Sequence, residues 1–116
     1  MQRVLVVDDD ALIALDVEQA LMEIGGLSIA IAHRLEDATA FVDGEPFDLV
    51  VLDLALGAES GLPLARRLNE EGRPFLVLSG YRAPGLKELP PGRVIEKPFA
   101  IDALVAAAAR LLGRAG

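Results

Sequence analysis

Carboxylates follow two aliphatic runs of the chain, and their crowding points to a metal ion. One run ends at Asp8, Asp9 and Asp10, and a second run ends at Asp53. Two like charges about 4 Å apart repel by on the order of 4 kcal/mol at an effective dielectric of 20, so such a cluster resists full ionisation. Mg²⁺ relieves this repulsion, because it binds one or two carboxylates and keeps places for water and phosphate oxygens. We therefore expect a Mg²⁺ site if the fold brings these acids together.

Two more polar side chains end aliphatic runs, and together with Asp53 they favour phosphoryl chemistry. Ser79 closes the run FLVLS, and Lys97 follows the run in RVIEKP. A carboxylate such as that of Asp53 can attack phosphorus and form an acyl phosphate. Phosphoryl transfer depends mainly on positioning and on neutralising the equatorial oxygens of the phosphoryl group. Mg²⁺, Ser79 and Lys97 are the groups that we expect to do this.

The segments that position these residues alternate between short aliphatic runs and helical patterns, as in a parallel α/β sheet with both faces covered. The expected strands are 3–7, 27–32, 48–52, 75–78 and 94–95. The expected helices follow Asp10 up to Gly25-Gly26, cover 35–42, run from an N-cap at Ser60 through Pro63 to Gly72, and cover 101–112. In such a sheet, ligands bind beyond the carboxyl ends of the strands. The five polar residues assigned to phosphoryl and Mg²⁺ chemistry are therefore expected on one rim.

The segment 80–93 does not follow this alternation. It contains Pro84, Pro90 and Pro91 and three glycines. Proline removes a hydrogen-bond donor and restricts the residue before it, so we predict no regular helix longer than about one turn there. The expected order of elements is β-α-β-α-β-α-β-loop-β-α.

Two further polar residues receive a structural interpretation. Asp10 is expected to cap the first helix, because aspartate is a preferred N-cap residue. His33 stands just after the second expected strand, remote from the centre of the expected rim, and is interpreted as a surface residue rather than a ligand or a phosphodonor.

The composition narrows the class of protein. The chain has 116 residues, of which 53% are hydrophobic, so we expect one domain, 1–116, with a buried core. A net charge of −7 and an aromatic content of 4% argue against direct binding of nucleic acid. Cysteine is absent, which excludes disulfides and thiolate metal sites. No stretch has the length of a membrane span or a leader peptide, so we expect a cytoplasmic protein without membrane contact.

Four motifs, in this order, resemble those of the receiver domains of two-component response regulators. VLVVDDD is similar to the acidic-pair strand of that family, DLVVLDLALG to its phospho-acceptor strand, FLVLSG to the strand with its switch hydroxyl, and EKPF to its Lys-Pro pair. The resemblance covers essentially the whole chain. It implies a flavodoxin-like, doubly wound α/β fold with a five-stranded parallel sheet in the order 2-1-3-4-5. Here the fourth helix would be reduced or replaced by a loop.

The resemblance also implies a role for each residue of the rim. Asp53 would accept the phosphoryl group from the phosphohistidine of a sensor histidine kinase or of a histidine phosphotransfer protein. Asp9 would bind Mg²⁺ directly and Asp8 mainly through water, while Asp53 and the backbone carbonyl of Ala55 would complete the protein ligands. The hydroxyl and the lysine named above would hold the phosphoryl group.

The chain departs from the family pattern around the expected output surface. The usual Met-Pro after the acceptor strand is Leu56-Gly57, and the aromatic residue that normally changes rotamer is Val94. Tyr81 could replace that aromatic residue as a switch, or it could simply cover the loop, and the sequence leaves both alternatives open. The stretch PFLVLSGY is similar to a divergent group of single-domain receivers, the FAT GUY type.

These observations favour a stand-alone receiver, since the chain ends at Gly116 without an output domain. It would signal to an unknown downstream protein by contact, and its only catalysis would be its own phosphorylation and a slow autodephosphorylation. The alternative is an interaction module that kept the fold and lost the switch, which Val94 and the altered segment 80–93 motivate. A third hypothesis is a hydrolase that uses an aspartyl-phosphate, but Ala55 stands where the second general acid of such an enzyme would be.

Overall fold

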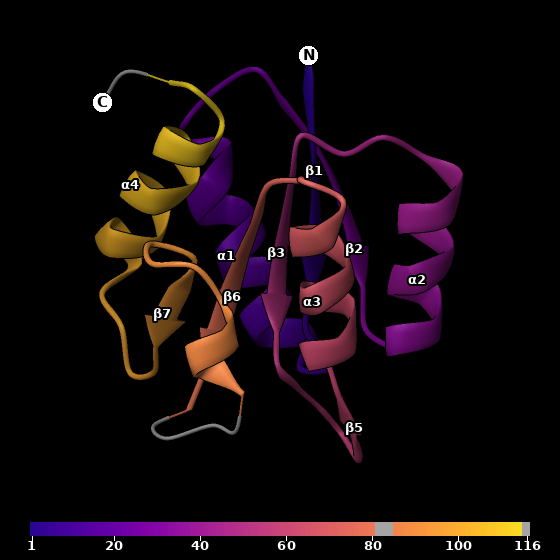
Figure 1. Ribbon diagram of the computed structural model, residues 1–116. Helices are drawn as coiled ribbons and strands as arrows, with labels where there is room; N and C mark the ends of the chain where they lie inside the picture. The colour runs from indigo at the N-terminus through magenta and orange to yellow at the C-terminus, as the bar shows by residue number, and fades with distance from the viewer. Residues whose placement is uncertain (81–84, 115–116) are drawn as a thin grey trace.

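A five-stranded parallel sheet forms the centre of the protein (Figure 1). The computed structural model describes residues 1–80 and 85–114. The strands of this sheet are β1 (Gln2–Val7), β2 (Leu27–Ala32), β3 (Leu49–Asp53), β6 (Phe75–Ser79) and β7 (Val94–Glu96). They lie in the order β2-β1-β3-β6-β7, and neighbouring strands are parallel. Counted along the chain without the short β4–β5 hairpin, this is the order 2-1-3-4-5, so the predicted doubly wound fold is confirmed.

Two layers of helices cover the sheet. One face carries α1 (Ala11–Met22) and α4 (Ile101–Leu111), and the other carries α2 (Leu35–Gly44) and α3 (Leu62–Glu70). The four predicted helices are confirmed, with small differences at their ends. None of the helices in the described part of the chain is both long and apolar enough to cross a membrane.

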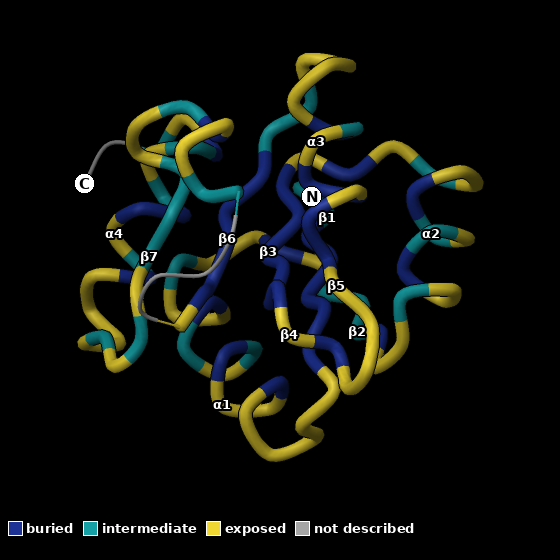
Figure 2. The backbone as a smooth tube through the Cα atoms, turned by 60° about the horizontal axis from the view of Figure 1, so that its bottom comes forward, coloured by how far each residue is buried: buried dark blue, intermediate teal, exposed yellow. Residues whose placement is uncertain are grey.

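The strands are buried because their side chains are aliphatic on both faces of the sheet. Val4 and Val6 pack in the cluster with α1 and α4, and Leu5 and Val7 pack in the cluster with α2 and α3. None of these four residues is more than 1% exposed. In Figure 2 the central strands are mostly dark blue, whereas the yellow segments lie at the helix surfaces and loops. The helices of the two layers thus bury both faces of the central strands.

The helix α1 buries only part of its apolar residues. Its buried residues are Ala14, Val17 and Leu21, which share one side of the helix. Leu12 and Leu15, which are also apolar, are 74% and 43% exposed. They differ because a 3.6-residue period turns them away from the side that packs on the sheet.

A short antiparallel hairpin, β4 (Ala55–Leu56) and β5 (Glu59–Ser60), follows β3 and was not predicted. Because Ser60 belongs to β5, the N-cap of α3 is Gly61, and the predicted cap at Ser60 is wrong. Ser60 Oγ still accepts a hydrogen bond from Leu62 N at 3.1 Å. Pro63 does stand in the first turn, as expected. Gly61 is needed because a Cβ atom there would lie 2.8 Å from the carbonyl oxygen of Asp53.

The described part of the segment 80–93 contains one turn of 3₁₀ helix, η1 (Leu86–Glu88), which confirms the predicted reduction of the fourth helix. This turn packs on α3. Gly85 has a φ of +83°, and a Cβ atom there would collide with the side chain of Leu62. Arg66 of α3 forms an ion pair with Glu88. The chain therefore crosses to β7 over the α3 side of the sheet.

Candidate functional site

The carboxyl ends of the parallel strands bring the predicted polar residues to one rim. Asp8 follows β1, while Asp53 and Ser79 are the last residues of β3 and β6. Lys97 follows β7, and its backbone N–H donates to the carbonyl oxygen of Ser79 at 2.7 Å. The register of the sheet therefore places these residues together, although they are far apart in the sequence.

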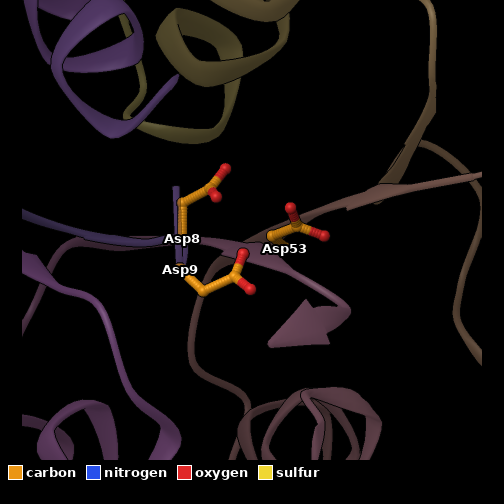
Figure 3. A group of neighbouring side chains, drawn as sticks. All are labelled: Asp8, Asp9 and Asp53. Atoms are coloured by element: carbon orange, nitrogen blue, oxygen red, sulfur yellow. The ribbon is translucent and has the colours of Figure 1, made fainter. Parts of the chain in front are cut away.

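Three carboxylates meet at the centre of this rim. Asp8, Asp9 and Asp53 each have one oxygen within 4.8 Å of the others, and Figure 3 shows these side chains converging from the ends of β1 and β3. Asp8 and Asp53 are only 1% and 3% exposed, whereas Asp9 faces solvent. Within the described residues, Asp8 Oδ2 is buried and accepts no hydrogen bond. An oxygen-only set with one unsatisfied buried carboxylate atom fits a hard cation such as Mg²⁺.

Burial changes the acidity of this cluster. The pKa of Asp8 is raised from 3.8 to about 6, mainly because burial disfavours its charged form. The neighbouring carboxylates of Asp53 and Asp9 raise it further, while a hydrogen bond from Asp10 N and the charge of Lys97 act in the opposite direction. Three negative charges at this rim are therefore unfavourable, and a cation would relieve their repulsion.

Asp53 is held in one orientation by two donors. Its Oδ2 forms an ion pair with Lys97 Nζ at 2.7 Å, and its Oδ1 accepts the N–H of Ala55 at 2.9 Å. Lys97 is partly exposed, with 32% of its side chain accessible, so it reaches the carboxylate from the open side of the rim. Ser79 Oγ is buried and has no hydrogen-bond partner in the described part of the chain. The hydroxyl is therefore available to a bound group.

The interpretation of Asp10 as a helix cap is confirmed. Its Oδ1 accepts the N–H groups of Leu12 and Ile13 at 2.9 and 3.2 Å. Its own N–H donates to Asp8 Oδ1 at 2.9 Å. Asp10 thus caps the N-terminus of α1 and also orients the carboxylate of Asp8.

Two residues that contact the acids were not identified from the sequence. Gly57 N donates to Asp9 Oδ2 at 2.8 Å, from a turn in which Gly57 has a φ of +63°. His33 Nδ1 lies 3.0 Å from the carbonyl oxygen of Asp8. His33 is exposed, as expected, but it also continues the contact between β1 and β2 beyond the last ladder bond.

The sequence did contain a signal for the contact of Gly57, because Leu56-Gly57 replaces the Met-Pro pair that is usual in the family. A proline has no N–H and cannot adopt a positive φ, whereas glycine allows both the turn and the donor. His33 had no comparable local signal, because its contact crosses between strands.

Three further sequence interpretations have different outcomes. Val94 lies in β7 and packs, partly buried, against the cluster with α2 and α3. Tyr81 lies outside the described residues. For Ala55 the structure defines the donor role of its N–H, and its carbonyl as a metal ligand stays a prediction.

A family model of the response regulator receiver domain matches residues 4–109. The transcriptional regulatory protein DltR of Streptococcus agalactiae is 34% identical over 110 residues, which are 90% of this chain and 49% of that protein. The sensory transduction protein LytR of Staphylococcus haemolyticus is 30% identical over 105 residues, 86% of this chain and 41% of that protein. The chain thus spans about half or less of the length of these curated relatives.

Solved structures agree with this match. The receiver domain of the Francisella response regulator 1452 superposes with a TM-score of 0.82 at 26% identity, covering 97% of this chain and 98% of that one. A response regulator from Burkholderia pseudomallei, solved with a phosphorylated aspartic acid, a calcium ion and citrate, has a TM-score of 0.76 at 27% identity. That match covers 92% of this chain and 66% of that one. With the fold and the rim as described, this chain belongs to the response regulator receiver domain family.

Proposed function

We propose that Asp53 accepts a phosphoryl group, in a Mg²⁺-dependent reaction, from the phosphohistidine of a sensor histidine kinase or a histidine phosphotransfer protein. One observation carries this proposal. The carboxylate of Asp53 lies at the rim, fixed by Lys97 and Ala55, with oxygens of Asp8 and Asp9 within 4.8 Å. The phosphorylated aspartic acid of the Burkholderia relative supports the same chemistry.

In this reaction a carboxylate oxygen of Asp53 attacks phosphorus. The new P–O bond forms as the P–N bond breaks, and its electron pair leaves with the imidazole of the donor. Lys97 moves from Asp53 Oδ2 to neutralise the charge on the phosphoryl oxygens, since its partly exposed side chain is already at the rim. Ser79 Oγ, buried and without a partner in the described residues, donates to the same group.

The metal would be held by Asp8, Asp9 and Asp53, with the Ala55 carbonyl as the fourth protein ligand. When bound, Mg²⁺ neutralises the carboxylates and the phosphoryl oxygens. Asp8 must be ionised to take part, so its pKa of about 6 makes metal binding weaker in mild acid.

The phosphorylated form would lose its phosphoryl group slowly. Ala55 stands two residues after Asp53 and has no polar side-chain atom that could orient an attacking water. A long-lived acyl phosphate suits a protein that signals by contact with a downstream partner. Catalysis would be limited to the protein's own phosphorylation and this slow loss.

The direct test uses a small phosphodonor such as acetyl phosphate with Mg²⁺, followed by intact mass spectrometry. We expect one added phosphoryl group on the wild-type protein, none on Asp53→Asn, and none on the wild type after chelation of Mg²⁺. Asp16→Asn, an exposed aspartate on α1, is the matched control and should be labelled like the wild type. Continued labelling of Asp53→Asn would show that another residue is the acceptor.

A second candidate is an interaction module that does not depend on phosphorylation. It is favoured by Val94 in place of the switch aromatic residue and by the single turn of η1. Amide NMR with Mg²⁺ and beryllofluoride separates the two candidates. Shifts that extend into β7 and η1 support the receiver that signals, and shifts confined to the acidic rim support the passive module.

A further inference from the structure

The strand β2 forms an edge of the sheet with free main-chain groups. Within the described residues, β2 pairs only with β1. The bond from Asp8 N to Ala32 O, 3.1 Å long, ends the β1–β2 ladder and defines its phase. In a parallel ladder of this phase, alternate residues of β2 bond to β1. The N–H and C=O groups of Ile29 and Ile31 therefore point to the open side.

This edge lacks the features that usually prevent pairing with another chain. Natural edge strands are commonly short or carry charges, prolines or bulges. β2 has six residues, LSIAIA, with no charge and no proline. The opposite edge, β7, has three residues and is flanked by Arg93 and Lys97. Of the two edges of the five-stranded sheet, the β2 edge is therefore the one suited to receive an added strand.

A cavity of about 430 Å³ opens beside this edge, between β2 and α2. Ile31 and His33 line it from the side of the strand, and Ala40 and Phe41 line it from the helix. Its volume lies in the range of pockets that hold a small ligand or a large side chain. A strand added at β2 would place alternate side chains toward this cavity.

The acidic residues that line the cavity favour a cationic side chain from the added strand. Asp37 and Glu45 both line it. Glu45 already forms an ion pair with Arg3, with 2.6 Å between Nη2 and Oε2. Asp37 forms no ion pair within the described part of the chain, so its charge is left for an occupant. The protein as a whole carries a net charge of −7, which disfavours a second copy at this edge.

We propose that the β2 edge and its cavity dock an extended, arginine-bearing segment of a partner protein. The segment adds a strand by hydrogen bonds to Ile29 and Ile31, as in recognition by strand addition. One arginine enters the cavity, its aliphatic stem and guanidinium against Phe41 and its charge beside Asp37. This surface does not include the carboxylates of the phosphoryl site, although His33 both lines the cavity and contacts the Asp8 carbonyl oxygen.

The test titrates the ¹⁵N-labelled protein with a peptide of alternating arginine and valine at physiological salt, followed by amide NMR. We expect shifts at Ile29, Ile31, Ala40 and Phe41, and none with a peptide in which glutamate replaces arginine. Asp37→Arg should weaken binding by about tenfold. Glu36→Arg makes the same change in net charge next to the cavity but does not line it, so it should weaken binding less than about twofold.

A backbone variant tests the strand addition itself. Ile31→Pro removes the outward N–H, a change that edge strands tolerate, whereas Ile31→Val keeps it. We expect the proline variant to lose peptide binding and the valine variant to keep it. Equal weakening by Asp37→Arg and Glu36→Arg, or shifts away from β2 and α2, would overturn the proposal. A dimer through Ile29 and Ile31 without peptide binding would overturn it too, because the edge would then belong to a second copy.

Discussion

The two sides of the acidic rim are held by different kinds of contact. On the β1–β3 side, each carboxylate accepts a backbone N–H: Asp8 from Asp10, Asp9 from Gly57, and Asp53 from Ala55. On the β6–β7 side, one partly exposed lysine reaches Asp53, and the Ser79 hydroxyl has no partner within the described residues. Backbone N–H groups thus hold the three carboxylates in place before a ligand binds. On the other side, the ammonium of Lys97 and the hydroxyl of Ser79 can turn toward a bound phosphoryl group.

The largest effect is expected from loss of the contact between Lys97 and Asp53. Lys97→Ala leaves the buried Asp53 carboxylate without its ion pair, and we expect a loss of about 2 kcal/mol in the free energy of unfolding. Phosphorylation by acetyl phosphate should slow by at least about a hundredfold, because the charge on the phosphoryl oxygens loses its neutralising partner. Urea unfolding and the rate of labelling measure the two effects.

The matched control is Lys87→Ala, an exposed lysine in η1. It should change both the free energy of unfolding and the labelling rate only slightly. If the two variants behave alike, the β6–β7 side of the rim has no special part in holding Asp53.

The second test concerns the buried carboxylate of Asp8 on the β1–β3 side. The pKa of Asp8 is raised to about 6 in the folded protein, so the folded state holds this proton more tightly than the unfolded chain does. The contribution of Asp8 to stability is therefore lost as pH rises from about 4 to about 6. Asp8→Asn should match the wild type near pH 4 and have the higher melting temperature above pH 6, in the absence of metal.

Adding Mg²⁺ should reverse that order. It stabilises the wild type by binding the ionised carboxylates and has less effect on the Asn variant. Asp16→Asn, exposed on α1, should show no such dependence on pH or metal. A stability difference between the wild type and Asp8→Asn that stays constant through this pH window would contradict the raised pKa.

The smallest expected effect tests the contact from β2 to the rim. His33→Ala removes the hydrogen bond to the Asp8 carbonyl and should cost about 0.5–1 kcal/mol in the free energy of unfolding. Mg²⁺ affinity should fall a few-fold, because the peptide that leads from Asp8 to Asp9 is less well fixed. His33→Asn keeps a donor near the same position and should restore most of the affinity. Calorimetric titration with Mg²⁺ compares the three proteins.

Most of the architecture could be predicted because local patterns encode it. Aliphatic runs flanked by helical periodicity located the five strands and four helices, and the prolines in 80–93 correctly excluded a regular helix from the described part of that segment. The cap at Ser60 was wrong because the β4–β5 hairpin could not be seen in two-residue strands. The exposure of Leu12 and Leu15 was likewise set by which side of α1 packs on the sheet.

For the site, the sequence by itself determined which residues stand at the strand ends: Asp8, Asp9, Asp53, Ser79 and Lys97. Chain direction and strand length are local properties, so these positions follow from the pattern of runs. Only the tertiary structure decided how the residues meet, because contacts such as Lys97 with Asp53 and Gly57 with Asp9 join distant parts of the chain. It also decided that Asp8 is buried enough to change its pKa, since desolvation depends on everything packed around a group and not on its neighbours in sequence.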